Sequence, residues 1–167
     1  MRVLGLDPGL ATTGYGIVER EAGRVRAVAV GAIRTPAEQP PAERLAYLRR
    51  AVLELAARHR PGAAAIERLF FNKNTRTAIS VGQASGVLTA AAAEAGLEIV
   101  EYGPLEIKMA VTGVGNAPKP QVQAMVAALL GLARPPKPAD AADACAVAIC
   151  HLQSGGLARA VSRAAAR

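Results

Sequence analysis

The order of apolar segments along the chain constrains its fold more than any single motif. Three short segments come first, at 3–7, 14–19 and 24–35, and each is bounded by turn residues such as Pro8 and Gly9. This pattern predicts three successive strands that pair as antiparallel neighbours. Consecutive strands joined by short turns usually lie side by side in a sheet.

Helices and strands alternate after position 40. Leucines and a valine recur at helical spacing across 43–59, which predicts an amphipathic helix that ends before Pro61 and Gly62. In chain order we then expect a strand at 63–67, a helix at 75–95, a strand at 97–102, and helices at 104–112, 121–130 and 139–152. This order predicts an α/β fold, with a mixed sheet covered by helices and a first strand that pairs with both the hairpin and the later parallel strands.

Length and composition indicate one folded unit. The 167 residues are 51% hydrophobic, enough for a full core, and they contain no internal repeat or domain linker. We expect one domain at 1–154, followed by a basic C-terminal tail at 155–167 that is a candidate for disorder. Cys145 and Cys150 have no partners at zinc spacing and are predicted to be buried, reduced thiols.

Charge and hydropathy indicate the class of binding partner and the cellular location of the protein. The net charge of +7 favours a polyanionic partner, either nucleic acid or an anionic membrane surface. No stretch approaches the roughly 18 apolar residues of a membrane span, and the first apolar run is too short for a signal peptide. We therefore expect a cytoplasmic protein without a membrane segment.

The acidic residues indicate a metal site. Asp7, Asp140 and Asp143 are the only aspartates in the sequence, and all lie in or beside apolar elements, while Glu67 ends the apolar run 63–67. Buried carboxylates need a pairing partner, and a divalent cation could serve all four. Two of the acids end neighbouring parallel strands, and the i, i+3 spacing places the other two on one helix face. Docking that helix near the strand ends would complete one cluster.

Such a cluster suits one or two Mg²⁺ ions. Mg²⁺ binds a few carboxylates together with water and phosphate oxygens, and two such ions can clamp an in-line phosphoryl displacement. The pattern thus predicts hydrolysis of a phosphodiester by an activated water. In the alternative interpretation, lysines or arginines neutralise the acids as structural ion pairs.

Three of the four lysines lie at or after the predicted strand ends. Lys73, Lys108 and Lys119 are candidates for contacts to backbone phosphates, although any single lysine of this kind is more often a solvated surface charge. Lys119 is flanked by Pro118 and Pro120, on a predicted loop that could close over a nucleic acid backbone.

The two phenylalanines and two of the glycines each have two possible roles. Phe70 and Phe71 could pack in the core, or one of them could stack on an exposed base. Gly82 and Gly86 give the helix 75–95 a small-residue face, which permits close helix approach within the core or across a dimer interface. His151 is predicted to be a structural histidine rather than a metal ligand.

Five groups of motifs, spread over nearly the whole chain, together resemble a known family. They are Gly5-Leu6-Asp7-Pro8-Gly9 with Thr13-Gly14-Tyr15-Gly16, Ile66-Glu67 with Phe70 and Lys73-Asn74, Gly82-Gln83-Ala84 with Gly86, Val111-Thr112-Gly113 through Lys119 and Gln121-Val122, and Asp140-Ala141-Ala142-Asp143-Ala144. The family is that of the RuvC-type Holliday-junction resolvases of bacteria. The resemblance implies a ribonuclease-H-like five-stranded mixed sheet flanked by helices on both faces.

The resemblance also implies an activity. It is that of a structure-selective endodeoxyribonuclease of DNA recombination and repair, a homodimer that nicks two strands of like polarity in a four-way DNA junction. Mg²⁺, for which Mn²⁺ would substitute, would be held by Asp7, Glu67, Asp140 and Asp143. Branch-migration proteins, RuvA and RuvB, are the implied partners.

The same resemblance suggests DNA contacts. Phe70 becomes a candidate for stacking on an opened base near the junction centre. Lys108 and Lys119 become candidates for contacts near the scissile phosphate, and Lys73 is a further DNA-binding candidate.

Two other functions stay open at this point. One is a non-catalytic junction-binding protein whose acids are structural. The other is an ATPase or sugar kinase of the actin-like superfamily, whose first strand also ends in an Asp-x-Gly turn. Length argues against the second, because 167 residues supply too little chain for two lobes around a nucleotide.

Overall fold

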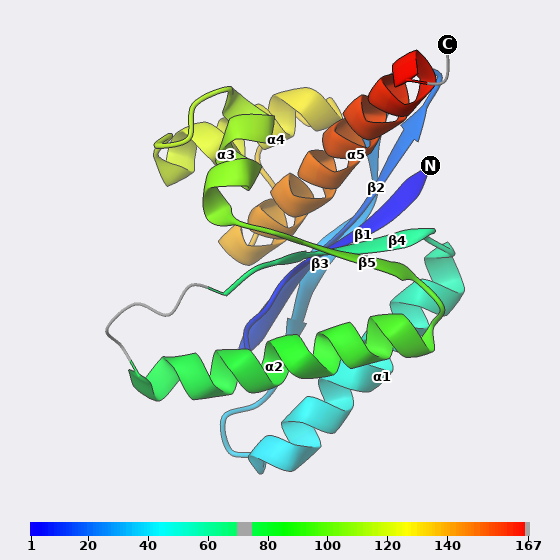
Figure 1. Cartoon of the computed structure of the whole chain (residues 1–167). Helices are drawn as coiled ribbons and strands as arrows, with labels where there is room; N and C mark the ends of the chain where they lie inside the picture. Colours follow the sequence, from blue (N-terminus) through cyan, green and yellow to red (C-terminus); the bar gives the residue numbers. More distant parts are fainter. Residues whose placement is uncertain (70–74, 166–167) are drawn as a thin grey trace.

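The computed structural model describes residues 1–69 and 75–165, which form a central sheet between two layers of helices (Figure 1). The strands are β1 (Arg2–Asp7), β2 (Thr12–Glu21), β3 (Arg24–Arg34), β4 (Ala63–Glu67) and β5 (Glu98–Tyr102), in the order β3-β2-β1-β4-β5. The helices are α1 (Pro41–His59) and α2 (Thr75–Glu94) on one face, and α3 (Pro104–Thr112), α4 (Lys119–Leu130) and α5 (Ala139–Ala165) on the other. The predicted five-stranded mixed sheet with helices on both faces is confirmed.

Strand β1 lies at the centre of the sheet and joins its two halves. It runs antiparallel to β2, with Asp7 opposite Gly14, and parallel to β4, with Leu6 beside Ile66. β5 continues the parallel half beyond β4. Both faces of β1 and β4 are covered by helices, which explains why their sequences are almost continuously apolar. The predicted pairing of the first strand with both the hairpin and the parallel strands is correct.

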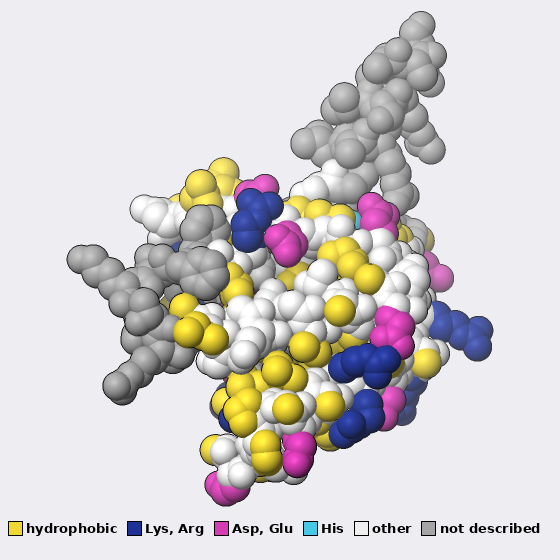
Figure 2. Space-filling view, turned by 60° about the horizontal axis from the view of Figure 1, so that its bottom comes forward, with side chains coloured by type: hydrophobic (Ala, Val, Ile, Leu, Met, Phe, Trp, Pro, Cys, Tyr) yellow, Lys and Arg dark blue, Asp and Glu magenta, His cyan; other side chains and the backbone are white. Residues whose placement is uncertain are grey.

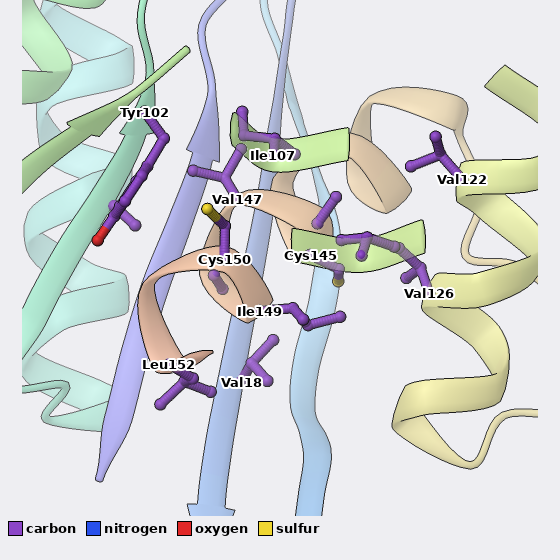
Figure 3. Packing of buried hydrophobic residues seen from close by; sticks show 14 of the residues in the cluster. Val18, Tyr102, Ile107, Val122, Val126, Cys145, Val147, Ile149, Cys150 and Leu152 are labelled. Atoms are coloured by element: carbon purple, nitrogen blue, oxygen red, sulfur yellow. The ribbon is translucent and has the colours of Figure 1, made fainter. Parts of the chain in front are cut away.

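Each face of the sheet has its own hydrophobic core. Leu4, Leu6 and Ile17 pack with α1 and α2 on one face. On the other face, Val3 and Val18 belong to a core that includes residues of α3, α4 and α5. Figure 3 shows Val18 in this core. Successive side chains of a strand point to opposite faces, so the apolar residues of β1 divide between the two cores.

Helix α5 contributes two thiols and a histidine to the second core. Cys145 and Cys150 are free and buried, and burial raises their pKa to about 12 and about 11, so both thiols stay protonated at neutral pH. His151 is buried, with its Nδ1 3.0 Å from the hydroxyl oxygen of Tyr102. The predictions of buried reduced thiols and of a structural histidine are confirmed.

Several helix boundaries differ from the sequence-based expectation, and α4 and α5 show why. Helix α4 begins at Lys119 rather than at 121, because a proline is tolerated in the first helical turn, where its missing N–H would have no partner. Helix α5 continues through Gly155 and Gly156 to Ala165, beyond its predicted end at Leu152. A glycine within a helix costs only about 1 kcal/mol relative to alanine, and alanine, leucine and arginine follow this pair.

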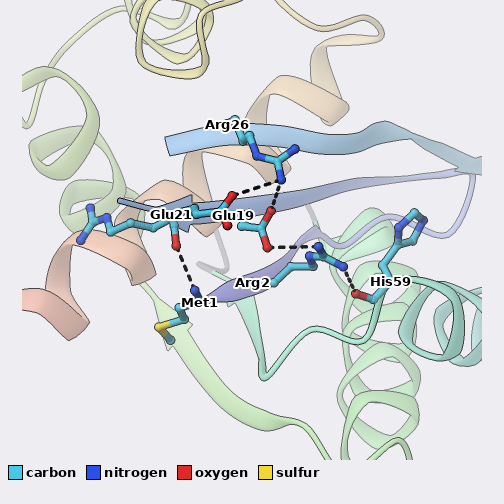
Figure 4. A network of polar contacts seen from close by, with 7 residues as sticks. Met1, Arg2, Glu19, Glu21, Arg26 and His59 are labelled. Carbon is cyan, nitrogen blue, oxygen red and sulfur yellow. Dashed lines mark hydrogen bonds and ion pairs between the residues drawn. The ribbon is translucent and has the colours of Figure 1, made fainter. Parts of the chain in front are cut away.

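A polar network fastens the start of β1, at the end of the strand remote from Asp7 (Figure 4). The Arg2 guanidinium donates to the His59 carbonyl oxygen at 2.6 Å and to Glu19 Oε1 at 3.0 Å, while Arg26 binds the other oxygen of Glu19 at 2.6 Å. These contacts join β1, β2 and β3 to the C-terminal end of α1.

The outer side of α1 and α2 carries hydrophobic side chains between charged ones (Figure 2). Tyr47 on α1 is 45% exposed and Ile79 on α2 is 70% exposed. An ion pair between Arg49 and Glu94 links the two helices at their surface. Within the described ranges 1–69 and 75–165, no helix has the length and apolar character needed to cross a membrane.

Candidate active site

Strand alternation directs Asp7 and Glu67 to the face of the sheet that α5 covers. In β1, Val3 belongs to the core beneath α5, so Asp7, four residues later, points the same way. In β4, Ala65 belongs to that core, and Glu67 follows two residues later. Because β1 and β4 are parallel neighbours, the two carboxylates lie at adjacent strand ends, as predicted.

Glycines on β1 and β2 bring α5 down to the backbone of the sheet. A Cβ atom added to Gly14 would lie 1.9 Å from the carbonyl oxygen of Asp140, and one added to Gly5 would lie 2.0 Å from that of Ala144. At Gly16 it would lie 2.7 Å from the Cys145 sulfur. Such distances leave no room for a side chain, so the first turns of α5, which carry Asp140 and Asp143, lie directly against the strands.

The four acids share one electrostatic environment. The pKa of Asp7 is raised from 3.8 to about 8, first by burial and then by the charges of Glu67, Asp143 and Asp140. Burial also raises the pKa of Glu67, and the charge of Asp143 adds to this effect. Neighbouring acids therefore make ionisation of Asp7 and Glu67 more costly, as expected for carboxylates in a partly buried site.

The predicted loop position of Lys119 is wrong. Lys119 does not lie on a loop but in the first turn of α4, and its Nζ is 2.6 Å from Asp143 Oδ2. This hydrogen bond raises the pKa of Lys119. Lys108 and Lys119 line one pocket together with Glu67 and Asp143, and both ammonium groups counteract the rise in the pKa of Glu67.

The set of donors is chemically suited to a divalent cation, although the side chains are not arranged around one. Four carboxylates are the oxygen ligands that hard divalent ions prefer, and the pKa of Asp7 is raised to about 8 even though the charge of Lys119 lowers it. Among residues 1–69 and 75–165, no three His, Cys, Asp or Glu side chains form a group that could hold a metal ion as they stand. Asp143 is instead bound to an ammonium group.

The raised pKa of Asp7 predicts a pH dependence of stability in the presence of a chelator. With a pKa of about 8 in the folded protein against 3.8 as the ordinary value, the folded state binds this proton more tightly than the unfolded chain. The Asp7 contribution to the free energy of unfolding is therefore full at low pH and is lost as pH rises towards about 8.

Denaturant unfolding of the wild type and of Asp7→Asn, measured across this range, tests the expectation. As pH rises from 3.8 to about 8, the free energy of unfolding should become smaller for the wild type relative to Asp7→Asn, because asparagine does not titrate. Above that pH the difference between the two proteins should stay constant. A difference that is constant with pH would contradict the raised pKa.

Sequence reasoning missed the docking role of Gly5, Gly14 and Gly16. Their signal was nevertheless present, because glycine is unfavourable inside a strand and often marks close approach of another backbone. The alternation Gly14-Tyr15-Gly16 places two glycines on one face of β2. Of the other predicted site residues, Phe70, Phe71 and Lys73 lie outside the described residues.

The sheet order β3-β2-β1-β4-β5, with helices on both faces and carboxylates where β1, β4 and α5 meet, defines the ribonuclease-H-like class of α/β proteins. A family model described as "Crossover junction endodeoxyribonuclease RuvC" matches residues 3–151. The chain belongs to the RuvC family of crossover junction endodeoxyribonucleases. This confirms the predicted family and enzyme class, and it argues against the actin-like alternative.

Individual relatives and solved structures agree with this assignment. Crossover junction endodeoxyribonuclease RuvC of Moorella thermoacetica is 56% identical over 151 residues, which cover 90% of this chain and 90% of that protein. The structure of Thermus thermophilus RuvC matches with a TM-score of 0.87 and 37% identity, over 95% of this chain and 97% of that chain. T. thermophilus RuvC in complex with a Holliday junction substrate matches with a TM-score of 0.86 and 35% identity, over 94% of this chain and 96% of that one.

Proposed function

We propose that this protein is a Mg²⁺-dependent endonuclease that resolves four-way DNA junctions by paired nicks, acting in the cytoplasm in recombination and repair. The observation that carries the proposal is that Asp7, Glu67, Asp140 and Asp143 lie at the ends of β1 and β4 and the start of α5, where burial and the charges of the other three acids raise the pKa of Asp7 to about 8. Such a cluster needs a cation to be fully ionised.

The proposed roles follow from the positions of the residues. Asp7 and Glu67 would hold the cation from the strand ends, and Asp140 and Asp143 would hold it from α5. When bound, one or two Mg²⁺ ions, or Mn²⁺ in their place, would supply an activated water and neutralise charge on the phosphate. Lys108 and Lys119, which line the same pocket, would bind the DNA backbone near the scissile bond.

A four-way junction is the substrate that the relatives favour. A solved relative 35% identical to this chain is bound to a Holliday junction, and the net charge of +7 suits a polyanion. Within this proposal, Phe70 stacks on an opened base, Lys73 binds DNA, and RuvA and RuvB are partners in junction processing.

Two nicks by one assembly imply a homodimer, and the outer face of α2 is a suitable interface. Ile79 is 70% exposed, and a Cβ added at Gly82 or Gly86 would meet no atom of the described residues within 4 Å. Of the two predicted uses of this small-residue face, helix packing inside the chain is therefore not supported by the described residues. A second copy of α2 could approach closely here.

Incubation of the purified protein with a mobile four-way junction, each strand labelled in turn, tests the proposed function. We expect symmetric nicks in two strands of like polarity with Mg²⁺, none with a chelator, and none in a linear duplex of the same sequence. Absence of cleavage with both Mg²⁺ and Mn²⁺ would favour the non-catalytic alternative, in which the Lys119–Asp143 ion pair is structural.

The ion pair between Lys119 and Asp143 predicts competition between the lysine and the metal. Removing this ammonium in Lys119→Met should tighten Mn²⁺ binding about tenfold, which corresponds to about 1.4 kcal/mol of relieved repulsion. Calorimetry with Mn²⁺ in the absence of DNA measures the affinity. Arg49→Met is the matched control, because it also removes a cation from an ion pair, on the opposite helical layer. Unchanged or weaker Mn²⁺ binding by Lys119→Met would contradict the competition.

A further inference from the structure

The turn that follows Asp7 is held by hydrogen bonds at three successive carbonyl groups. This turn, 8–11, joins β1 to β2. The Thr13 hydroxyl donates to the Gly9 carbonyl oxygen at 2.6 Å, and the Thr35 hydroxyl donates to that of Leu10 at 2.5 Å. The backbone N–H of Thr35 donates to the Ala11 carbonyl oxygen at 3.1 Å. A connecting turn on a protein surface would ordinarily leave such carbonyls to water.

Two of these bonds come from Thr35, which α1 in turn holds in place. Thr35 follows the last residue of β3 and is 6% exposed. Its hydroxyl oxygen accepts a hydrogen bond from Arg44 Nε at 2.8 Å while its proton is donated to Leu10. The hydroxyl is thus held from two sides, by the bond that it donates and by the bond that it accepts. A polar chain therefore runs from α1 through Thr35 to the backbone of the turn.

The other side of Asp7 is already fixed by the sheet and by α5. Asp7 pairs with Gly14 in the β1–β2 ladder, and Gly14 touches the backbone of Asp140. The turn 8–11 is thus the remaining segment that can shift the Asp7 backbone relative to the other acids. Displacements near 1 Å at a catalytic group can slow a reaction by about 100-fold.

The geometry points to Thr35, oriented by Arg44, as a positioning residue for Asp7. Thr35 touches neither Asp7 nor the other acids through any contact described above, and it acts through the turn. This inference rests on the proposed nuclease function and deepens it, because it assigns to α1, on the far layer, a part in setting the catalytic geometry.

The test compares variants that remove a hydrogen bond of the polar chain between α1 and the turn 8–11 with variants that lose the same type of bond elsewhere. Thr35→Val removes the hydroxyl at nearly constant volume, Thr35→Ser keeps it, and Arg44→Gln removes the guanidinium. Thr89→Val is the control for the first, because the Thr89 hydroxyl also donates to a backbone carbonyl, that of Ser85 at 2.9 Å on α2. The control for Arg44→Gln is Arg49→Gln, which breaks an ion pair of α1.

Three measurements are made on each variant. These are the single-turnover rate of junction cleavage with Mg²⁺, the junction dissociation constant with Ca²⁺, and the thermal midpoint. Thr35→Val and Arg44→Gln should slow cleavage about 10- to 100-fold, with the dissociation constant unchanged. Thr35→Ser should restore most of the rate, and Arg49→Gln should cleave as the wild type does, while Thr89→Val serves as the control for the thermal midpoint and for hydrogen exchange.

The positioning role would be overturned if Thr35→Val and Arg44→Gln lost no more of the cleavage rate than the control. It would also be overturned if Thr35→Ser cleaved no faster than Thr35→Val. Amide hydrogen exchange of residues 8–12, followed by mass spectrometry, separates this outcome from failure of the proposed function. We expect faster exchange in Thr35→Val than in Thr89→Val, whether or not the wild type cleaves junctions. Equal exchange in the turn would refute the inference, whereas a wild type that never cleaves would refute the nuclease proposal alone.

Discussion

Asp7→Asn is expected to slow cleavage of a four-way junction by about 1,000-fold or more while leaving junction binding intact or tighter. A carboxylate that binds the cation contributes to transition-state stabilisation of several kcal/mol, and about 4 kcal/mol corresponds to about 1,000-fold in rate. Binding should not suffer, because asparagine removes a negative charge that repels the DNA backbone. Single-turnover cleavage with Mg²⁺ and gel-shift binding with Ca²⁺ measure the two effects separately.

A matched control for Asp7→Asn is Glu94→Gln, which also neutralises one carboxylate, in the ion pair with Arg49 on the opposite helical layer. It should leave both cleavage and binding near wild-type values. If Asp7→Asn cleaved within about tenfold of the wild-type rate, this carboxylate would contribute at most about 1.4 kcal/mol to transition-state stabilisation. Such a result would contradict its role as a metal ligand.

Gly14→Ala is expected to destabilise the protein by about 3 kcal/mol and to abolish cleavage. The added methyl group would lie 1.9 Å from the Asp140 carbonyl oxygen and 2.4 Å from its carbon. The clash is between the new methyl group and backbone atoms of α5, so no change of side-chain rotamer can relieve it. The cost is therefore expected at the upper end of the range for overpacked cores. Helix α5 must move away from the sheet, and it carries Asp140 and Asp143 with it.

Gly62→Ala is the matched control for Gly14→Ala, since Gly62 immediately precedes β4 and a Cβ there would meet no described atom within 4 Å. Chemical denaturation and junction cleavage should both stay close to wild type for Gly62→Ala. If Gly14→Ala were as stable and as active as this control, close docking of α5 would not be what assembles the acids.

Local patterns predicted the secondary structure well because burial acts on each segment separately. The helical spacing of apolar residues identified α1 to within two residues, and the apolar run ending at Glu67 was predicted with the bounds it has as β4. The predicted boundaries are wrong where the preference of one residue pair was outweighed by the preferences of the residues around it. Gly155 and Gly156 were expected to follow the end of α5, but the residues around them are good helix formers, and the helix continues.

The four acids of the candidate site could be foreseen in the same way. Asp7 and Glu67 end adjacent parallel strands, which follows from the order of elements, and Asp140 and Asp143 share a helix face through their spacing. The position of Lys119 could not be foreseen. Its ion pair with Asp143 joins residues 24 positions apart and depends on how α4 packs beside α5.

The sequence by itself determined which residues form strands and helices, and which acids lie in apolar surroundings, because hydrophobic periodicity and turn chemistry act over a few residues. Tertiary structure alone decided that Gly5 and Gly14 admit α5 to the sheet, that Lys119 enters the acidic cluster, and that Arg44 and Thr35 hold the turn after Asp7. Each of these depends on distances between segments remote in sequence. Such distances are set by close packing of whole elements, which no local pattern encodes.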